Sequence, residues 1–259
     1  MAGLTGKTPK QTYKDLLHLD NGNSGVDNTL RQVKDGFGDG SCFYIETNSI
    51  KVKPEVDDTA LFDVHDKDGN SQFKVDSSND LVTASGNYVN TQYAYFACNS
   101  TDAIPASSGN HYAIPYGNVF ASSADVGLGT GANPATTLAV STIADDVVPM
   151  MWFVPDAITI DAVHAWIAGN SSSGDSIKLH LMTYDIVTSG GSTCGDLSSG
   201  TVVADGGDIS HDGYEQMDFQ TLTLQSANVA ANNICLFTFY SDGVNSDYGV
   251  NVTVKYHLR

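Results

Sequence analysis

The sequence has little charge, few basic residues and no long apolar run. Charged residues make up 16% of the 259 positions, and 12 Lys and Arg stand against 30 Asp and Glu, a formal net charge of −18. A field of that sign repels nucleic-acid phosphates. No apolar run approaches the ~18–20 residues of a membrane helix, and the start lacks the apolar segment of a secretory signal. We therefore expect no nucleic-acid partner, no membrane partner and no signal peptide.

The sequence also lacks the motifs of common enzyme and metal-site classes. The four cysteines form no CxxC pair, so neither a structural zinc site nor a thioredoxin-type pair is indicated. The seven histidines show no HxH or HExxH spacing, and no GxSxG elbow is present. Most acids lie beside Gly, Asn or Ser, as solvated turn residues do. We predict a non-enzymatic protein with no catalytic residues, no metal site and no cofactor.

The stretch LFDVHDKDGNSQFKVDSSND, residues 61–80, contains half of a calcium-loop pattern at Asp66, Asp68 and Asn70. A complete EF-hand loop needs Gly at its sixth position and a bidentate Glu at its twelfth. This chain has serine at both positions. Because DG and GN are turn-forming pairs, we predict a hairpin turn in place of a calcium loop.

Apolar alternation in the same stretch predicts short strands. Phe62 and Val64 fall on one face of a first strand, Phe73 and Val75 on one face of a second, and a third begins at Leu81. KDGN and SSND supply the turns between them. A small ribbon of this kind is marginal in water by itself. We expect it to bury its large side chains against sister copies or another surface.

The first 40 residues are polar and glycine-rich, with too few apolar residues for a core. YKDLLHL predicts about two helical turns, and TLRQVKDGFG predicts a short helical or extended piece ended by glycines. We expect an extended arm over residues 1–53 that becomes ordered on a partner. Its expected contact residues are the apolar ones: Tyr13, Leu16, Leu17, Leu19, Val26, Leu30 and Val33.

Residues 136–259 contain seven or eight apolar stretches separated by Gly, Asn, Asp and Ser turns. This spacing predicts a C-terminal antiparallel β-sandwich, jelly-roll-like in topology. In AITIDAVHAWIAG, the alternation places Ile160, Ala162 and His164 on one face, with His164 toward the interior. In SIKLHLMTYDIVT, it places His180 toward solvent.

Residues 91–135 are rich in Tyr, Ala, Ser, Gly and Pro, and we expect a connector there. Exposed Tyr residues pack at subunit interfaces or stack on ligands. Packing between chains is the favoured interpretation, with ligand contact and ordinary core packing as alternatives. The aromatic residues concerned are Tyr93, Tyr95, Phe96, Tyr112, Tyr116 and Phe120.

The leader GLTGKTPKQTYKDLLHLDNGNSGVDNTLRQVKDGFGDGS, the hairpin ALFDVHDKDGNSQFKVDSSNDLVTASG and the compact all-β end together resemble fibre and capsid-associated proteins of tailed bacteriophages. The pattern LFxVxDxxGNxxFxVDxxxxLV is similar to the hairpin repeats of trimeric phage fibre shafts. The resemblance is clearest over residues 1–90 and rests on fold class alone over residues 136–259. A single repeat implies a short shaft, which favours a compact decoration over a long tail fibre.

The resemblance implies a virion structural protein, a homotrimer assembled in the host cytoplasm. Residues 1–53 would form the virion-anchoring arm on capsid or tail proteins, 54–90 a short trimerising β-shaft, 91–135 the connector and 136–259 the sandwich head. The implied trimer-interface residues are Phe62, Val64, Phe73, Val75 and Leu81. One alternative is a tail-fibre adhesin or carbohydrate-binding module that recognises a host-surface glycan. Another is a glycan depolymerase, which would need two carboxylates in one cleft.

Overall fold

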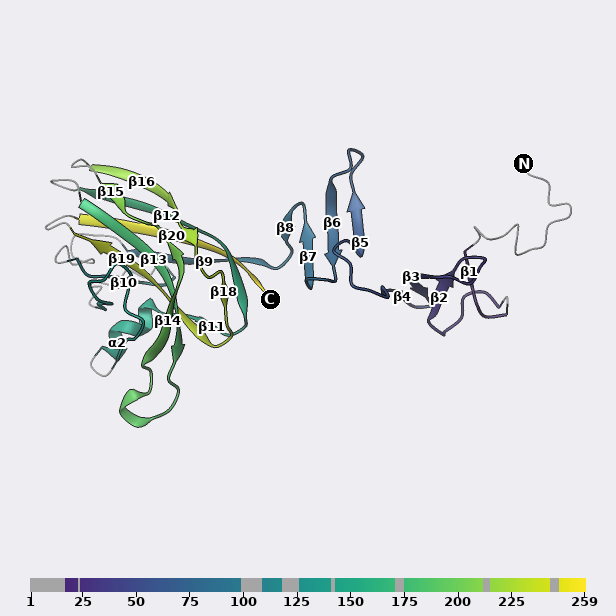
Figure 1. Ribbon diagram of the computed structural model, residues 1–259, viewed down its shortest axis with the longest axis horizontal. Helices are drawn as coiled ribbons and strands as arrows, with labels where there is room; N and C mark the ends of the chain where they lie inside the picture. The colour runs from purple at the N-terminus through teal and green to yellow at the C-terminus, as the bar shows by residue number, and fades with distance from the viewer. Residues whose placement is uncertain are drawn as a thin grey trace. The chain divides into compact units, whose positions relative to one another are not determined.

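The computed structural model describes residues 17–22, 24–98, 109–117, 126–140, 143–170, 175–211, 215–242 and 247–259. Within these residues the chain is all-β, with twenty strands, two 3₁₀ turns and one short helix, α2 (Ala144–Val147) (Figure 1). The chain divides into two compact units, Met1–Val89 and Asn90–Arg259. The predicted all-β class is confirmed.

The N-terminal unit begins with a four-stranded antiparallel sheet where we expected an extended arm. Its strands follow one another in the order β1-β2-β3-β4. A turn built on Asp35 joins β2 to β3: its carboxylate accepts backbone N–H bonds from Phe37 (2.8 Å) and Asp39 (3.0 Å). The helical turns expected over residues 13–19 fall partly outside the described residues; of the rest, Leu17 has no regular structure, and His18 and Leu19 form a strand. The strands are β1 (His18–Leu19), β2 (Arg31–Lys34), β3 (Gly40–Ile45) and β4 (Ile50–Val52).

The second sheet of this unit contains the predicted hairpin. It is a meander in the order β5-β6-β7-β8. Gly69, with φ of 86°, occupies the turn between β5 and β6. Ser85 and Gly86 form the two-residue link from β7 to β8, and both have positive φ. A two-residue hairpin turn needs positive φ to match the right-handed twist of its strands. The strands are β5 (Phe62–His65), β6 (Ser71–Asp76), β7 (Leu81–Ala84) and β8 (Asn87–Tyr88).

The C-terminal unit is a two-sheet sandwich. One sheet has the order β16-β12-β20-β9, and the other contains β11, β19, β13 and β14 as neighbours in that order. Numbering these eight strands along the chain gives 6-3-8-1 and 2-7-4-5, the strand order of a jelly roll. The eight are β9 (Thr91–Cys98), β11 (Trp152–Val154), β12 (Ile158–Asn170), β13 (Asp175–Ile186), β14 (Leu197–Asp205), β16 (Glu215–Thr221), β19 (Asn233–Ser241) and β20 (Asp247–Leu258).

Shorter elements complete this unit. Four short strands extend the two sheets: β10 (Tyr112–Ile114) and β15 (Ile209–His211) pair with β19 and β13, and β17 (Thr223–Leu224) and β18 (Asn228–Val229) pair with β14 and β12. The 3₁₀ turns are η1 (Val148–Met150) and η2 (Gly191–Thr193). We expected residues 91–135 to form a connector. Among the described residues of this range, β9 and β10 are strands of the sandwich, so that expectation is wrong there.

The sandwich has two apolar cores, one on each side of the sheet that contains β13 and β19. The first lies between the two sheets and includes Phe96, Leu179 and Phe237, all fully buried. The second lies on the outer side of that sheet, where residues 126–140, α2 and η1 cover Tyr184 and Leu236. Burial raises the pKa of the Cys98 thiol to about 11 and that of Cys235 to about 12, so both behave as small core residues.

A β-bulge in β12 reverses the predicted orientation of His164. The register against β20 shifts between Ile160 and Ala162, and the extra residue moves every later side chain to the opposite face. Val163 and Ala165 are therefore fully buried. His164 lies on the outer face, where its ring stacks on Phe219 at 5.6 Å between centroids.

Candidate functional site

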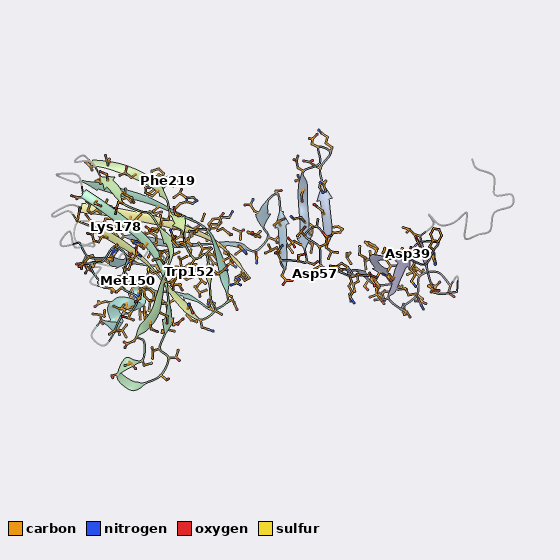
Figure 2. The ribbon with its side chains drawn as sticks, in the orientation of Figure 1. Asp39, Asp57, Met150, Trp152, Lys178 and Phe219 are labelled. Atoms are coloured by element: carbon orange, nitrogen blue, oxygen red, sulfur yellow. The ribbon has the colours of Figure 1, made fainter. Side chains whose placement is uncertain are left out.

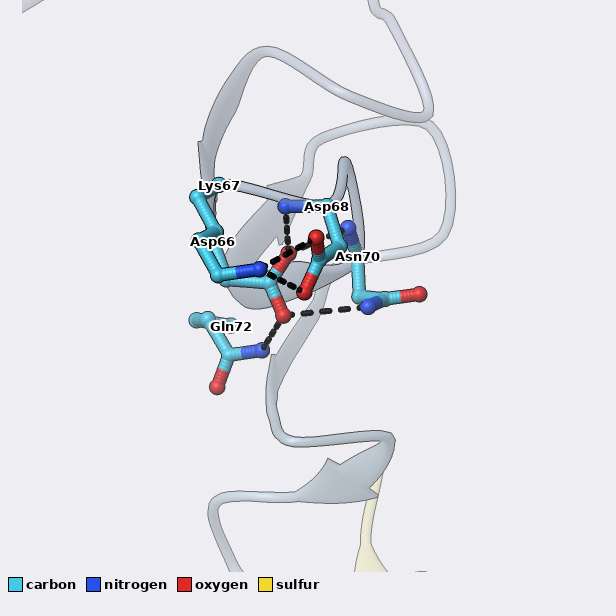
Figure 3. Close-up of polar contacts among 5 residues, drawn as sticks. All are labelled: Asp66, Lys67, Asp68, Asn70 and Gln72. Carbon is cyan, nitrogen blue, oxygen red and sulfur yellow. Dashed lines mark hydrogen bonds and ion pairs between the residues drawn. The ribbon is translucent and has the colours of Figure 1, made fainter.

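The aspartate-rich turn between β5 and β6 is organised by one carboxylate (Figure 3). Asp66 accepts hydrogen bonds from the backbone N–H groups of Asp68 and Asn70, each at 2.9 Å. It also accepts side-chain bonds from Asn70 (3.0 Å) and Gln72 (3.3 Å). The Asn70 side chain is the main reason that the pKa of Asp66 lies below its usual value. Lys67 Nζ lies 2.6 Å from Asp68 Oδ1. Asp66 therefore holds the turn by hydrogen bonds, and Asp68 forms an ion pair with its neighbour.

One face of the β5–β8 sheet is mainly apolar, with Asn87 of β8 opposite Ala84 as a polar neighbour. The register places Phe62 opposite Val75 and Val64 opposite Phe73, and residues directly opposite each other point to the same face. The rings of Phe62 and Phe73 meet edge to face at 6.3 Å. Phe62, Val64 and Phe73 remain 43%, 44% and 38% exposed in the single chain. This β5–β8 apolar face consists of Phe62, Val64, Phe73, Val75, Val82 and Ala84.

Leu81 does not belong to this face, although we expected it there. It lies opposite Asp76, so it points to the other side of the sheet. Val82, opposite Val75, takes the place that we assigned to Leu81. The remaining four predicted residues share the β5–β8 apolar face.

The opposite face of the β5–β8 sheet is polar. Asp63 accepts a hydrogen bond from the Ser71 hydroxyl at 2.5 Å and lies 3.0 Å from His65 Nε2. The Ser71 bond is the main reason that the pKa of Asp63 is lowered. The bond from His65 to the Gly69 carbonyl and the nearby Asp63 raise the pKa of His65. The two faces of the sheet therefore differ clearly in chemistry.

The β1–β4 sheet repeats this two-faced design. Leu19 pairs with Val33, and Ile45 pairs with Ile50. Ile50 is 67% exposed. Arg31 shares the face and is paired with Asp27 at 3.0 Å. The β1–β4 apolar face consists of Leu19, Val33, Phe43, Ile45, Ile50 and Val52.

The predicted anchor residues are divided among several places. Leu19 and Val33 lie on the β1–β4 apolar face. Leu17, Val26 and Leu30 are exposed outside the strands, at 68%, 52% and 37%. The other two, Tyr13 and Leu16, lie outside the described residues.

Burial separates this unit sharply from the sandwich. Over residues 17–22 and 24–89, Asp76 is the single buried side chain. It is 8% exposed and accepts bonds from the backbone N–H (3.0 Å) and the side chain (2.9 Å) of Asn79. No apolar side chain in that part of the chain is buried, so neither sheet has a core of its own.

The aromatic cluster predicted in residues 91–135 does not act as one unit. Phe96 is fully buried between the two sheets and contacts Phe237 at 5.8 Å. Tyr93 and Tyr95 point to the other side of β9 and are 53% and 43% exposed. Tyr116 stacks on the Trp152 ring at 6.1 Å. Tyr112 is half-buried, and Phe120 lies outside the described residues.

Histidines form the principal buried polar contacts of the sandwich. His180, expected at the surface, is 1% exposed and packs edge-on against His111 at 5.1 Å. Burial lowers the pKa of His180 to about 4, despite Asp205 at 3.5 Å. His211 is fully buried between Asp218 (2.9 Å) and the Gly169 carbonyl (3.0 Å). Each contact joins neighbouring segments of this unit.

The described part of the chain offers little to a small ligand or metal. Its residues contain no group of three or more His, Cys, Asp and Glu that could hold a metal ion. None of its helices has the length and apolar character of a membrane span. One cavity of about 170 Å³ is smaller than the ~300 Å³ of typical ligand sites. Its lining is Gln92, Trp152, Val154, Pro155, Asp156, Ile158, Tyr256 and Leu258.

Comparison with protein families and with curated proteins gives no match, and comparison with solved structures gives weak likenesses. A chain from a crystal structure of the T13 IBDV viral particle aligns with a TM-score of 0.14 and 8% identity. The alignment covers 69% of this chain and 42% of that one. A likeness this weak carries no argument about fold or function.

Proposed function

We propose that the chain is a non-enzymatic structural protein of a tailed-phage virion, a homotrimeric capsid decoration or short fibre. Its N-terminal unit assembles the trimer and docks on the particle, and its jelly-roll unit forms an exposed head. The observation that carries the proposal is the pair of exposed apolar faces in the N-terminal unit, where no apolar side chain is buried over residues 17–22 and 24–89.

The energetics of a single sheet layer support assembly through these faces. A sheet buries its apolar face only when a second layer covers it. Fully burying a Phe or Val side chain contributes about 1.5–3 kcal/mol, and the β5–β8 apolar face offers Phe62, Phe73 and four smaller side chains per copy. Packing three copies around one axis supplies the missing layers and protects strand edges from non-specific pairing.

The hairpin repeat supports the virion assignment. The residues that match the phage shaft pattern, Leu61 to Val82, form the β5–β6–β7 meander. The apolar letters of that pattern at Phe62, Val64, Phe73 and Val75 lie on one face. These four shared positions are therefore ones that a trimer axis would bury, whereas Leu81 lies on the other face.

The mass of the full chain in solution tests the assembly. Light scattering after size exclusion is expected to give three times the 27.4 kDa of one chain. Phe73→Asp, which places a charge on the β5–β8 apolar face, is expected to give a single-chain mass. Thr83→Asp is the matched control, because Thr83 lies opposite Lys74 on the polar face. A wild-type mass near 27.4 kDa at every concentration, or a trimeric Phe73→Asp, contradicts the proposal.

The location on a particle tests the virion role. Antibodies against the head, applied to purified particles of the source phage, are expected to label the capsid or the tail. Particles that contain no such chain by mass spectrometry and carry no label contradict the virion assignment while leaving the trimer untouched.

A further inference from the structure

The outer face of the β16–β12–β20–β9 sheet carries a cluster of exposed aromatic and apolar side chains. Trp166 lies opposite Phe219, and Ala168 lies opposite Met217. The Trp166 and Phe219 rings meet at 5.0 Å. Met217, Phe219 and Trp166 are 66%, 50% and 47% exposed (Figure 2 labels Phe219). With Tyr93 and Tyr95 of β9 and His164 of β12, they form what we call the aromatic face.

The composition of the aromatic face is that of a protein–protein interface. Tyr, Trp, Phe and Met are enriched in such interfaces, and charged residues are depleted from their centres. The outward positions of β20 add Asn251 and Thr253 beside the aromatic residues. The charged residues at this face include Glu215, the first residue of β16, Lys255, near the end of β20, and Asp161 at the β12 bulge, which bonds His257.

The other sheet of the sandwich shows what an apolar outer face requires. Its outer side chains, Tyr184 and Leu236 among them, are fully buried because residues 126–140, α2 and η1 cover them. Within the C-terminal unit, no described segment covers the aromatic face in the same way, since its largest side chains are about half exposed. An antiparallel sheet that faces water normally presents polar side chains. The aromatic face therefore points to a partner outside the C-terminal unit.

Chain connectivity indicates what that partner is. β9, the edge strand that carries Tyr93 and Tyr95, starts at Thr91, and β8 ends at Tyr88. Two residues join them, so the link spans at most about 11 Å. Copies gathered through the N-terminal unit therefore hold their heads at an effective concentration in the millimolar range. This step rests on the proposed function.

We propose that sister heads cover the aromatic face, so that the sandwich is a second assembly surface. On assembly, several half-exposed aromatic side chains of each copy become buried against the sandwich of a neighbouring copy. Such a contact needs little affinity of its own, because the N-terminal unit already brings the copies together. The aromatic face then serves assembly, and host recognition falls to other surfaces of the head.

Methionine oxidation by hydrogen peroxide tests this contact in the full chain, because the oxidation rate of a Met follows its access to solvent. Met217 is 66% exposed in the single chain, whereas Met150 and Met182 are 1% exposed and serve as internal controls. In the assembled protein we expect Met217 to oxidise as slowly as the two controls, measured by peptide mass spectrometry.

Two charge variants make the test specific. Phe219→Asp is expected to raise the oxidation rate of Met217 on the order of tenfold. Phe153→Asp is the matched control, because Phe153 is also 50% exposed but lies on β11 of the other sheet. It is expected to leave the rate unchanged.

The outcomes separate this inference from the proposed function. Fast oxidation of Met217 in a sample of trimeric mass overturns the inference and leaves the proposed function standing. A single-chain mass at every concentration overturns both, because no sister head is then present to cover the face. Fast oxidation that slows when oligosaccharides from a bacterial surface polysaccharide are added also overturns the inference, and assigns the face to a glycan.

Discussion

The two units of this chain use similar alternating strands and reach opposite states of burial. In the C-terminal unit, two sheets pack together and side chains such as Phe96 and Phe237 are fully buried. In the N-terminal unit, two separate sheets leave Phe62 and Phe73 about 40% exposed, and Asp76 alone is buried among its described residues. The two units differ in the number of sheets that pack face to face. An amphipathic sheet becomes stable only when another layer covers its apolar side. The C-terminal unit contains its second layer, and we propose that the N-terminal unit obtains one from other copies.

The largest expected effect is a truncation in the head. Phe237→Ala removes a fully buried ring between the two sheets, and we expect it to lower the free energy of unfolding by about 3–5 kcal/mol. Because the core lies within one chain, the loss is expected to be the same at all protein concentrations. Denaturant titration measures it. Phe153→Ala, at a half-exposed position, is the control and is expected to change little.

The corresponding truncation in the N-terminal unit is expected to behave differently. Phe62→Ala is expected to cost about 1.5–3 kcal/mol per copy in the assembled protein and almost nothing once the chains are separated by dilution. Unfolding curves over a hundredfold range of concentration measure the difference. Thr83→Ala, on the polar face, is the control. A concentration-independent loss would mean that Phe62 is buried within its own chain.

One histidine in each unit is expected to contribute to the pH dependence of stability, and the two contributions have opposite signs. Burial, aided by Lys178 and His111, lowers the folded-state pKa of His180 to about 4 against the raising influence of Asp205. The unfolded chain then binds more protons, and the head loses about 1–3 kcal/mol as pH falls from 6.5 toward 4. The pKa of His65 is raised. Its contribution is therefore complete below pH 6.5 and is lost as pH rises through the folded-state value.

Thermal unfolding between pH 4.5 and 8 checks this difference. His180→Gln is expected to flatten the acid limb of the head transition, and His164→Gln, on the outer face, is expected to leave it in place. A head whose stability does not change between pH 6.5 and 4.5 is incompatible with a neutral buried His180.

The smallest expected effect is at the β5–β6 turn. Asp66→Ala removes the acceptor of four hydrogen bonds. We expect faster amide exchange over residues 66–72 with the trimer mass retained. Asp68→Ala, which removes only the partner of Lys67, is expected to leave exchange unchanged. Loss of the trimer on Asp66→Ala would show that the turn itself forms part of the interface.

Much of the fold could be predicted because it follows from local patterns. Alternation and turn residues indicated the strands at Phe62 and Phe73 and the sandwich strands after residue 136. The β1–β4 sheet was not predicted, because its short strands lie in a polar, glycine-rich segment and pair through contacts that no single stretch displays. β9 was assigned to a connector because its pairing partner, β20, lies far away in the sequence.

Side-chain direction was harder to predict than strand position. The bulge near Ile160 has no signal in the sequence, yet it turns His164 outward. Leu81 was assigned to the wrong face because the SSND turn pairs it with Asp76, and one residue of register exchanges the faces of a strand. The aromatic face was missed because Trp166, Phe219 and Tyr95 come from three separate strands.

Amide hydrogen exchange at two concentrations tests the central claim most directly. One sample of the full chain is kept at trimeric mass, and the other is diluted until its mass is that of one chain. We expect β5, β6 and β7 to be protected in the first and to exchange rapidly in the second, while β12, β13 and β19 stay protected in both. Equal protection of β5, β6 and β7 in the two samples would contradict the account, because the N-terminal unit would then be stable without sister copies.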